Sequence, residues 1–277
     1  MCTITMPISF KKMHGSGNDF ILIDNRSGII RPEDGPCLAK RLSRRRFSVG
    51  ADGLILVENS VTADFKWRFF NADGSEAEMC GNGGRCAARF ATIIGAAPAK
   101  LNFETKAGII HAEVNKQLVK LELPGPIGML FDIPIEVNGL KMQVHFINTG
   151  VPHAVILADD IERIDVKQIG RSIRFHERFR PQGTNVDFVE VEGADVIVRT
   201  YERGVEDETL ACGTGSVASA IIAAAKAGVA KRPVTVKTRG GESLNIYFDL
   251  CGQEASNIFL EGEAALVYSG VIDGDVF

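Results

Sequence analysis

Short segments of alternating apolar and polar residues dominate this chain, and only four stretches have the spacing of a helix. Helices are predicted over 37–46, 83–94, 165–175 and 213–227, and Gly95 and Gly228 stand where the second and fourth would end. The alternation predicts many strands, separated by turns rich in Gly, Pro, Asn and Asp. These cover 8–13, 20–24, 54–58, 65–70, 101–104, 109–114, 118–123, 143–146, 154–157, 186–191, 196–201, 234–238, 244–249 and 258–262, and the series in the second half begins near Ile135.

One order of elements occurs twice along the chain. A strand, an acidic turn, a Cys-Gly-x-Gly loop and an apolar helix are followed by a run of strands, first around Cys80 and again around Cys212. The helix over 213–227 is apolar on nearly all sides, so we expect it to be buried. A buried helix among strands predicts a sheet wrapped around a central helix, twice. The sequence therefore predicts an α/β (α+β) fold of two similar domains.

Pro124-Gly125-Pro126 interrupts the strand pattern and is the predicted domain boundary. The chain has 277 residues, with 45% hydrophobic and 24% charged residues, which predicts a packed core. The net charge of −4, with no basic half, argues against nucleic acid as a partner. The basic cluster over 40–46 is interpreted as a solvated helix face. No apolar run reaches the roughly 18–20 residues that span a bilayer, and no secretory signal begins the chain, so we predict no membrane partner and a cytoplasmic location.

The six cysteines, at positions 2, 37, 80, 86, 212 and 251, lack the spacing of a disulfide framework or a metal site. Most are expected to be small apolar residues, but Cys80 and Cys212 each precede a glycine-rich helix start. The N–H groups and the dipole at a helix start stabilise a thiolate and bind a carboxylate. If the two thiols face one substrate, a thiolate removes the α-proton and the opposite thiol donates one. The pattern thus indicates racemisation or epimerisation without a cofactor or metal.

The two cysteine segments, EMCGNGGRC (78–86) and ACGTGS (211–216), resemble the signature motifs of the diaminopimelate epimerase family. The resemblance extends over nearly the whole chain and includes 14–20, 69–75, 152–155, 183–188 and 201–204. It implies two mixed, mostly antiparallel sheets, each around a helix, with the active site in the cleft between the domains. It also implies that the last strand returns to the first domain, giving domains 1–124 with 265–277, and 125–264.

The implied activity is the interconversion of LL- and meso-2,6-diaminopimelate in lysine and peptidoglycan-precursor biosynthesis. The resemblance makes Cys80 and Cys212 the acid/base pair and diaminopimelate the small-molecule substrate; we also consider a homodimer. It implies the following roles for further residues: Gly81, Asn82, Gly213 and Thr214 hold the reacting carboxylate, Asn18, Asn71, Asn185 and Glu202 bind substrate, Arg203 binds the distal carboxylate, and His153 supports the thiols.

Two positions depart from the commonest family pattern, because many members have Asn at the position of Val151 and Gln at that of Gly53. Asn148 lies nearby as a candidate replacement. Loss of these side chains predicts looser recognition of the distal end, so a racemase acting on acidic amino acids is one alternative. A proline-type racemase is another, although such enzymes typically carry histidine where this chain has Asn82. A non-catalytic thiol or anion-binding protein is the third.

Overall fold

The computed structural model describes residues 7–273, so Cys2 and the end of the predicted returning segment lie outside the described residues. The chain forms two compact units. One contains the described residues up to Leu121 together with those from Gly262 onward, and the other contains Glu122–Glu261. The sequence-based boundaries, at 124 and 264, lie close to these positions. Each unit is described separately below.

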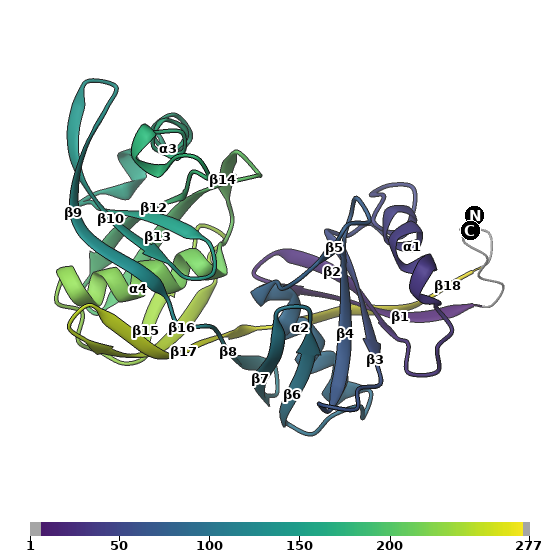
Figure 1. Cartoon of the computed structure of the whole chain (residues 1–277). Coiled ribbons are helices and arrows are strands. Elements are labelled where there is room, and N and C mark those ends of the chain that lie inside the picture. The colour runs from purple at the N-terminus through teal and green to yellow at the C-terminus, as the bar shows by residue number, and fades with distance from the viewer. Residues whose placement is uncertain (1–6, 274–277) are drawn as a thin grey trace. The chain divides into compact units, whose positions relative to one another are not determined.

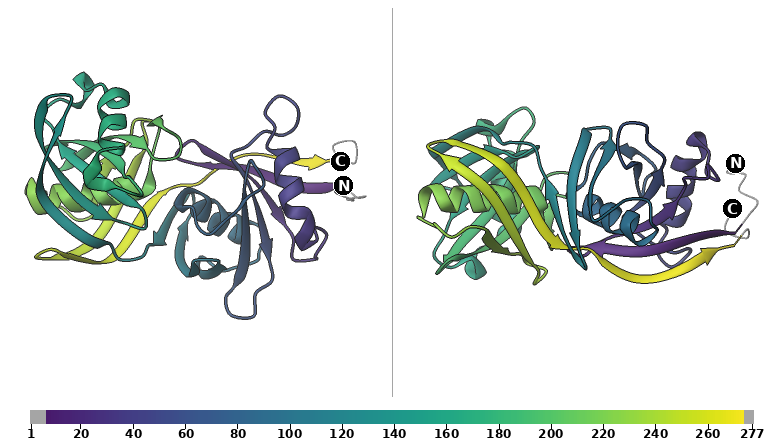
Figure 2. Two further views of the ribbon diagram at one scale, coloured as in Figure 1. Left: turned by 45° about the horizontal axis from the view of Figure 1, so that its top comes forward. Right: turned by 90° about the horizontal axis from the view of Figure 1, so that it is seen from below.

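The first unit is a mixed sheet with two α-helices. Its sheet order is β18-β1-β2-β3-β4-β6-β7-β8, and β5 pairs with β4. Among the strands described in this unit, only the β2–β3 and β4–β6 pairs are parallel. The elements are β1 (Ile8–Gly15), β2 (Asn18–Asp24), η1 (Pro32–Asp34), α1 (Gly35–Leu42), β3 (Gly53–Glu58), β4 (Phe65–Asn71), β5 (Glu76–Ala77), α2 (Gly81–Ile93), β6 (Lys100–Thr105), β7 (Gly108–Asn115), β8 (Leu118–Glu122) and β18 (Ala265–Ile272). Figure 2 shows β18 alongside β1, with which it pairs in antiparallel register.

The second unit repeats this plan. Its order is β9-β10-β11-β12-β13-β15-β16-β17, and β14 pairs with β13. Here too only two pairs are parallel, β11–β12 and β13–β15. The elements are β9 (Ile127–Val137), β10 (Leu140–Asn148), β11 (Pro152–Leu157), η2 (Ile161–Arg163), α3 (Val166–Arg174), η3 (Glu177–Phe179), β12 (Asn185–Glu192), β13 (Asp195–Glu202), β14 (Asp207–Thr209), α4 (Gly213–Lys226), β15 (Val234–Lys237), β16 (Ser243–Cys251) and β17 (Glu254–Glu263).

The two sheets therefore correspond strand for strand. β1–β4 of the first unit match β10–β13 of the second, the short β5 matches β14, and β6–β8 match β15–β17, with parallel and antiparallel pairs in the same places. Along the chain, the central helix of each unit follows the short strand and precedes a hairpin, and these helices are labelled α2 and α4 in Figure 1. The predicted fold of two similar domains is confirmed.

Small residues allow the sheets to close around these central helices. In α4 every residue from Gly215 to Ala223 is buried, and in α2 the buried stretch begins at Gly83. The helix α4 packs with strand residues such as Val198, Leu244 and Ile246 in one apolar core. Because alanine and glycine project little from the helix axis, strands can approach α4 on several sides. The small, buried residues thus allow each central helix to pack inside its own unit.

Two predicted elements differ from the structure. Helix α1 ends at Leu42 rather than at 46, because the backbone turns there and Arg46 adopts a φ of 72°, which a helix cannot contain. Strand β9 begins at Ile127, well before the predicted start, and includes Pro134. Its first half is largely exposed, so its sequence carries little apolar alternation. No helix within residues 7–273 is long and apolar enough to cross a membrane.

Candidate active site

Cys80 and Cys212 occupy the same structural position in their units, immediately before the central helix. Both have extended backbone angles, with φ and ψ of −150° and 119° for Cys80 and −122° and 113° for Cys212. Their carbonyl groups accept the first helical hydrogen bonds, from Gly84 N–H at 2.7 Å and Ser216 N–H at 2.9 Å. The Sγ of Cys80 also accepts a bond from the Gly83 N–H, with N and S 3.5 Å apart. Each cysteine is therefore the N-cap residue of its helix, and the thiol of Cys80 also makes a side-chain cap hydrogen bond.

Glycine leaves both helix starts uncovered. A Cβ added at Gly81 would meet no atom within 4 Å, and one at Gly213 would meet only Leu260 Cδ1 at 3.5 Å. The N–H groups of the first two residues of a helix lie outside its hydrogen-bond ladder and point along its axis. In this chain those residues are Gly81 and Asn82 in α2, and Gly213 and Thr214 in α4. Two such N–H groups at the positive end of a helix dipole can bind a carboxylate.

Asn18 lies next to the first thiol. Its Oδ1 accepts a hydrogen bond from Cys80 Sγ at 3.7 Å, and its Nδ2 donates to Asp52 at 2.7 Å. Arg45 holds this arrangement, because its guanidinium donates to both Asp52, at 2.9 Å, and Asp19, at 2.6 Å. Arg45 is exposed to solvent, as the interpretation of the basic cluster expects, but it lies beyond the end of α1 rather than on a helix face, and it connects these two carboxylates.

The other two predicted asparagines of the first unit differ in their surroundings. The Oδ1 of Asn82 accepts from Arg85 at 3.0 Å, and the fully buried Arg85 also donates to Ser16 at 2.9 Å. Asn71 is exposed at the end of β4, and its Nδ2 donates to Ser75 Oγ at 3.0 Å. Asn18 and Asn82 are thus fixed close to the start of α2, while Asn71 is held by its own turn.

The second thiol lies at the end of a polar chain that runs into the core. Cys212 Sγ and Thr214 Oγ1 are 3.4 Å apart, and Thr214 Oγ1 is 3.0 Å from His153 Nε2. His153 is fully buried, and its Nδ1 lies 2.7 Å from Asp187 Oδ2. Asn185 Nδ2 approaches His153 Nε2 at 3.4 Å. The structure thus brings together three of the predicted residues with Cys212 and adds Asp187.

Two further predicted residues border this group. Arg203 donates its backbone N–H to Asn185 Oδ1 at 2.7 Å, and its guanidinium donates to the Gln182 carbonyl at 3.3 Å. Burial raises the pKa of Glu202 above its ordinary value, against the opposing effects of a bond to Thr209 and the nearby His153. A half-buried carboxyl group that protonates easily suits a site that handles protons.

Burial also raises the pKa of the Cys212 thiol far above its ordinary range, and the charges of Glu202 and Asp187 add to this shift. The hydrogen bonds from Thr214 and the Gly215 backbone act in the opposite direction but do not outweigh it. The helix start therefore acts on the pKa of Cys212 in the expected direction, but burial outweighs its effect. Because the thiol is stable here, forming its thiolate requires a nearby group that can accept the proton.

Asn148, the candidate replacement for the missing polar side chains, takes part in a local turn. Its Oδ1 accepts from the Gly150 N–H at 3.0 Å, which closes the turn after β10. Gly53 has no room for a side chain, because an added Cβ would lie 2.5 Å from Phe69 Cε2 and 2.8 Å from the Phe70 carbonyl. The glycine at this departure from the family pattern is thus required by the Phe69 ring. Asp187 was missed, although an acid within the apolar run 186–189 was a signal that could have identified it.

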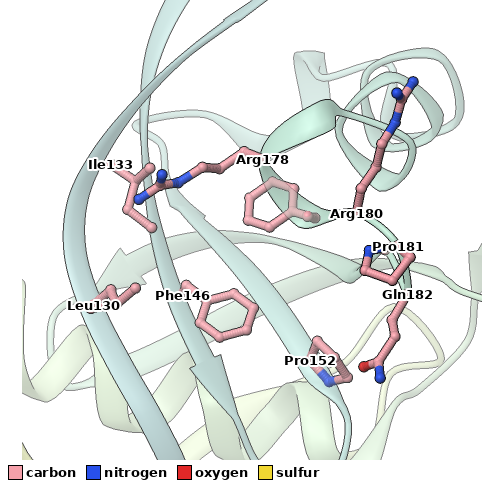
Figure 3. A pocket seen from close by; sticks show the side chains of 10 residues that line it. Leu130, Ile133, Phe146, Pro152, Arg178, Arg180, Pro181 and Gln182 are labelled. Atoms are coloured by element: carbon pink, nitrogen blue, oxygen red, sulfur yellow. The ribbon is translucent and has the colours of Figure 1, made fainter.

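A separate hollow of about 290 Å³ lies in the second unit. Phe146 and Phe179 line it with nearly parallel rings whose centroids are 6.1 Å apart. Figure 3 shows Arg178 extending toward Ile133 above this space, while Arg180 points away from it. None of the predicted site residues lines the hollow. Among residues 7–273, no cluster of three or more His, Cys, Asp or Glu side chains is placed to hold a metal ion.

Comparison with known proteins finds relatives that match nearly the whole chain. A family model described as diaminopimelate epimerase matches residues 10–123 and 145–267. A protein of Aquifex aeolicus named diaminopimelate epimerase is 46% identical, over 97% of this chain and 99% of that protein. One of Methanocella arvoryzae with the same name is 45% identical, over 97% and 98%.

Solved structures of lower identity share the fold. A PhzF-family phenazine biosynthesis protein of Bacillus anthracis has a TM-score of 0.73 at 16% identity, covering 97% of this chain and 99% of the other. A probable proline racemase of Agrobacterium radiobacter has a TM-score of 0.69 at 14% identity, covering 98% and 94%. At such identities these structures speak for the architecture alone.

Proposed function

This chain belongs to the diaminopimelate epimerase family, and we propose that it interconverts LL- and meso-2,6-diaminopimelate through Cys80 and Cys212. One observation carries the proposal: each unit places a thiol at the uncovered N-terminus of its central helix. The repeated geometry supplies two proton carriers and two carboxylate-binding helix ends. A reaction that removes a proton from one face of a carbon and returns one to the other needs both.

In the proposed mechanism the carboxylate of the reacting centre binds the N–H groups of Gly81, Asn82, Gly213 and Thr214. As the α-proton leaves, negative charge moves onto this carboxylate, where the helix ends stabilise it. One cysteine, as the thiolate, takes the proton, and the other, as the thiol, protonates the opposite face. The mechanism requires the two units to present their sulfur atoms to opposite faces of one α-carbon.

The remaining polar groups suit the rest of the substrate. The amides of Asn18, Asn71 and Asn185 offer donors and acceptors to ammonium and carboxylate groups. Arg203 can form a two-pronged contact with the distal carboxylate, and Glu202 lies beside it in sequence. These assignments complete a site that works without a cofactor. The proposed setting is cytoplasmic lysine and peptidoglycan-precursor biosynthesis, with a homodimer as the proposed assembly.

The test follows proton exchange during turnover. Incubated with LL-diaminopimelate in deuterated water, the protein is expected to form the meso isomer and to place deuterium at one α-carbon. Cys80→Ala and Cys212→Ala should each lower the rate by about 10²-fold or more, as expected for loss of an acid or base. Cys251→Ala is the matched control, because this thiol is exposed and distant in sequence from both helices. Full activity in either of the first two variants would reject the two-thiol mechanism.

Parallel assays with glutamate and aspartate test the alternative of a broader racemase. Turnover of either at a rate near that of diaminopimelate would replace the proposed substrate while leaving the mechanism intact. Absence of exchange with all three substrates would reject the proposed function.

A further inference from the structure

Hydrogen positions in the chain from Cys212 to Asp187 follow from one backbone group. The N–H of Arg203 can only donate, so the atom of Asn185 that it meets at 2.7 Å is the amide oxygen. The amide nitrogen of Asn185 then faces His153 Nε2, at 3.4 Å. Because that nitrogen is a donor, Nε2 must be the acceptor. The ring proton of neutral His153 therefore resides on Nδ1 and is donated to Asp187 Oδ2 at 2.7 Å.

This tautomer determines which groups donate and which accept in the other hydrogen bonds of the series. With Nε2 as an acceptor, the Thr214 hydroxyl donates to it across 3.0 Å. The oxygen of Thr214 can then accept a hydrogen bond from the Cys212 S–H group, with sulfur and oxygen 3.4 Å apart. Thr200 donates its hydroxyl to the second oxygen of Asp187 at 2.7 Å, so both carboxylate oxygens are engaged. All bonds thus point in one direction, from the sulfur to the carboxylate.

The first unit shows that the fold itself does not need this series of hydrogen bonds. His153 pairs with Asn185 at the start of β11 and β12, as Phe20 pairs with Gly53 at the start of β2 and β3. Two residues farther along β12 stands Asp187, and two residues past Gly53 stands Ile55. The same architecture therefore accepts an apolar pair, Phe20 and Ile55, where the second unit has a buried histidine and carboxylate.

The packing against the central helices confirms this correspondence. The third residue of each central helix faces the strand position occupied by Ile55 in the first unit and by Asp187 in the second. A Cβ added at Gly83 of α2 would meet Ile55 first, at 3.4 Å, whereas one at Gly215 of α4 would meet Asp187 Oδ1 at 2.5 Å. A buried charge costs stability unless it is fully hydrogen-bonded. Its presence beside only one of two equivalent helices indicates a purpose other than folding.

We propose that Asp187 is a positioning residue for proton transfer at Cys212, holding His153 in the Nδ1–H form so that Thr214 can pass the thiol proton to Nε2. The S–H bond of Cys212 breaks as its proton moves to Thr214 Oγ1, and the hydroxyl proton of Thr214 moves to Nε2. A neutral thiol and imidazole become a thiolate and an imidazolium, and the Asp187 carboxylate balances the new positive charge. The inference rests on the proposed function, because it concerns Cys212 as a proton carrier.

Two explanations of Asp187 make opposite predictions. The titratable groups facing His153 and the thiol are Asp187 from β12, Glu202 from β13 and Cys212 itself at the start of α4. Through space alone, the negative charge of Asp187 opposes ionisation of Cys212. Removing that charge would then make the thiolate form more easily. If the relay operates, removing Asp187 leaves the imidazolium without its partner, and the thiolate forms less easily.

The first measurement is the tautomer of His153 in the unaltered protein. Nitrogen NMR of ¹⁵N-histidine-labelled protein at pH 9 distinguishes protonated from unprotonated ring nitrogens. The signal of His153 is assigned by its loss in His153→Gln. We expect a protonated Nδ1 and an unprotonated Nε2. The reverse assignment would overturn the proposal, and this readout requires no activity.

The second measurement compares Asp187→Asn with Glu190→Gln, which removes a charge from the same strand. Alkylation of Cys212 by iodoacetamide, followed by peptide mass spectrometry at pH 8, reports thiolate formation. We expect Asp187→Asn to react about tenfold more slowly and to lose about 10²-fold in kcat with little change in KM. Glu190→Gln should match the unaltered protein. Faster alkylation in Asp187→Asn would show a charge effect alone and overturn the relay.

Thr214 provides a second variant pair if Asp187→Asn does not fold. Thr214→Ser keeps the hydroxyl and should retain kcat within a few-fold, whereas Thr214→Val should lose about 10²-fold. Equal rates in the two would overturn the relay. Failure of the proposed function is distinguishable, because it would be seen as absent proton exchange in the unaltered protein.

Discussion

Replacing Gly215 with alanine tests the packing between α4 and the buried Asp187. The added Cβ would lie 2.5 Å from Asp187 Oδ1 and 3.3 Å from Cys212 Cβ. Asp187 cannot move away freely, because His153 and Thr200 each hold it at 2.7 Å. Either the carboxylate shifts and loses a hydrogen bond, or the start of α4 moves away from β12.

Gly83→Ala is the matched control. Gly83 and Gly215 are both the third residue of a central helix, and each follows its N-cap cysteine at the same spacing. The intrinsic helix preference of alanine over glycine is therefore the same at both sites and cancels in the comparison. At Gly83 the new Cβ would meet Ile55 and Trp67 at 3.4 Å, which is an ordinary contact distance.

The expected difference follows from two costs. Overpacking a well-filled core costs about 1–3 kcal/mol. Disturbing a buried, hydrogen-bonded carboxylate costs a further 1–3 kcal/mol or so. We expect Gly215→Ala to be less stable than Gly83→Ala by about 2–4 kcal/mol, after allowing for partial relaxation.

Urea unfolding followed by far-ultraviolet circular dichroism measures this difference as a shift in midpoint. Circular dichroism is preferable to fluorescence, because the single tryptophan, Trp67, lies in the first unit. The alkylation rate of Cys212 provides an independent check of the site in the folded variant. If Gly215→Ala proved as stable as Gly83→Ala, the close approach of α4 to Asp187 would be wrong.

Two carboxyl groups give predictions about pH. Burial of Asp19 by itself raises the pKa of its carboxyl group, but the hydrogen bonds and charges of Arg45 and Lys12 outweigh this effect and lower the pKa from 3.8 to about 2. The stabilisation is therefore present above pH 4 and lost as the pH falls toward 2, so Asp19→Asn should flatten the stability profile in this window, by about 2 kcal/mol in urea titrations; an unchanged slope would contradict the ion pairs. Burial raises the pKa of Glu202, so ionising it destabilises the folded state as the pH rises above its ordinary value of 4.5. Compared with the unaltered protein, Glu202→Gln should therefore have a higher urea midpoint at pH 7, and this difference should be smaller at pH 4. A midpoint below that of the unaltered protein at pH 7 would show that the charged form is stabilised instead.

Much of the fold follows from local patterns in the chain. Alternation identified most strands, and the apolar run after Cys212 identified a buried helix, because both patterns reflect which side chains leave water. The predictions that differed had physical causes outside these patterns. Arg46 takes a left-handed conformation that no periodicity reveals, and β9 is exposed along its first half.

The candidate site was predicted in its residues but not in its connections. The repeated Cys-Gly-x-Gly segment marked both thiols, and the family resemblance supplied His153 and the asparagines. Asp187 was absent from that set, since its role depends on a histidine 34 positions earlier in the sequence. The ion pairs of the exposed Arg45 with Asp19 and Asp52 could not be predicted, because these residues meet only after the chain folds.

The sequence by itself determined the duplication, the two helix starts and the cysteines at their N-cap positions, because these depend on neighbours along the chain. The tertiary structure alone decided what surrounds each thiol. Strand pairing between β11 and β12 places His153 beside Asp187, while the equivalent pairing of β2 and β3 buries Phe20 near Ile55. Two similar sequence motifs therefore have unlike surroundings, because hydrogen bonding and burial are set by residues that only the folded sheet brings together.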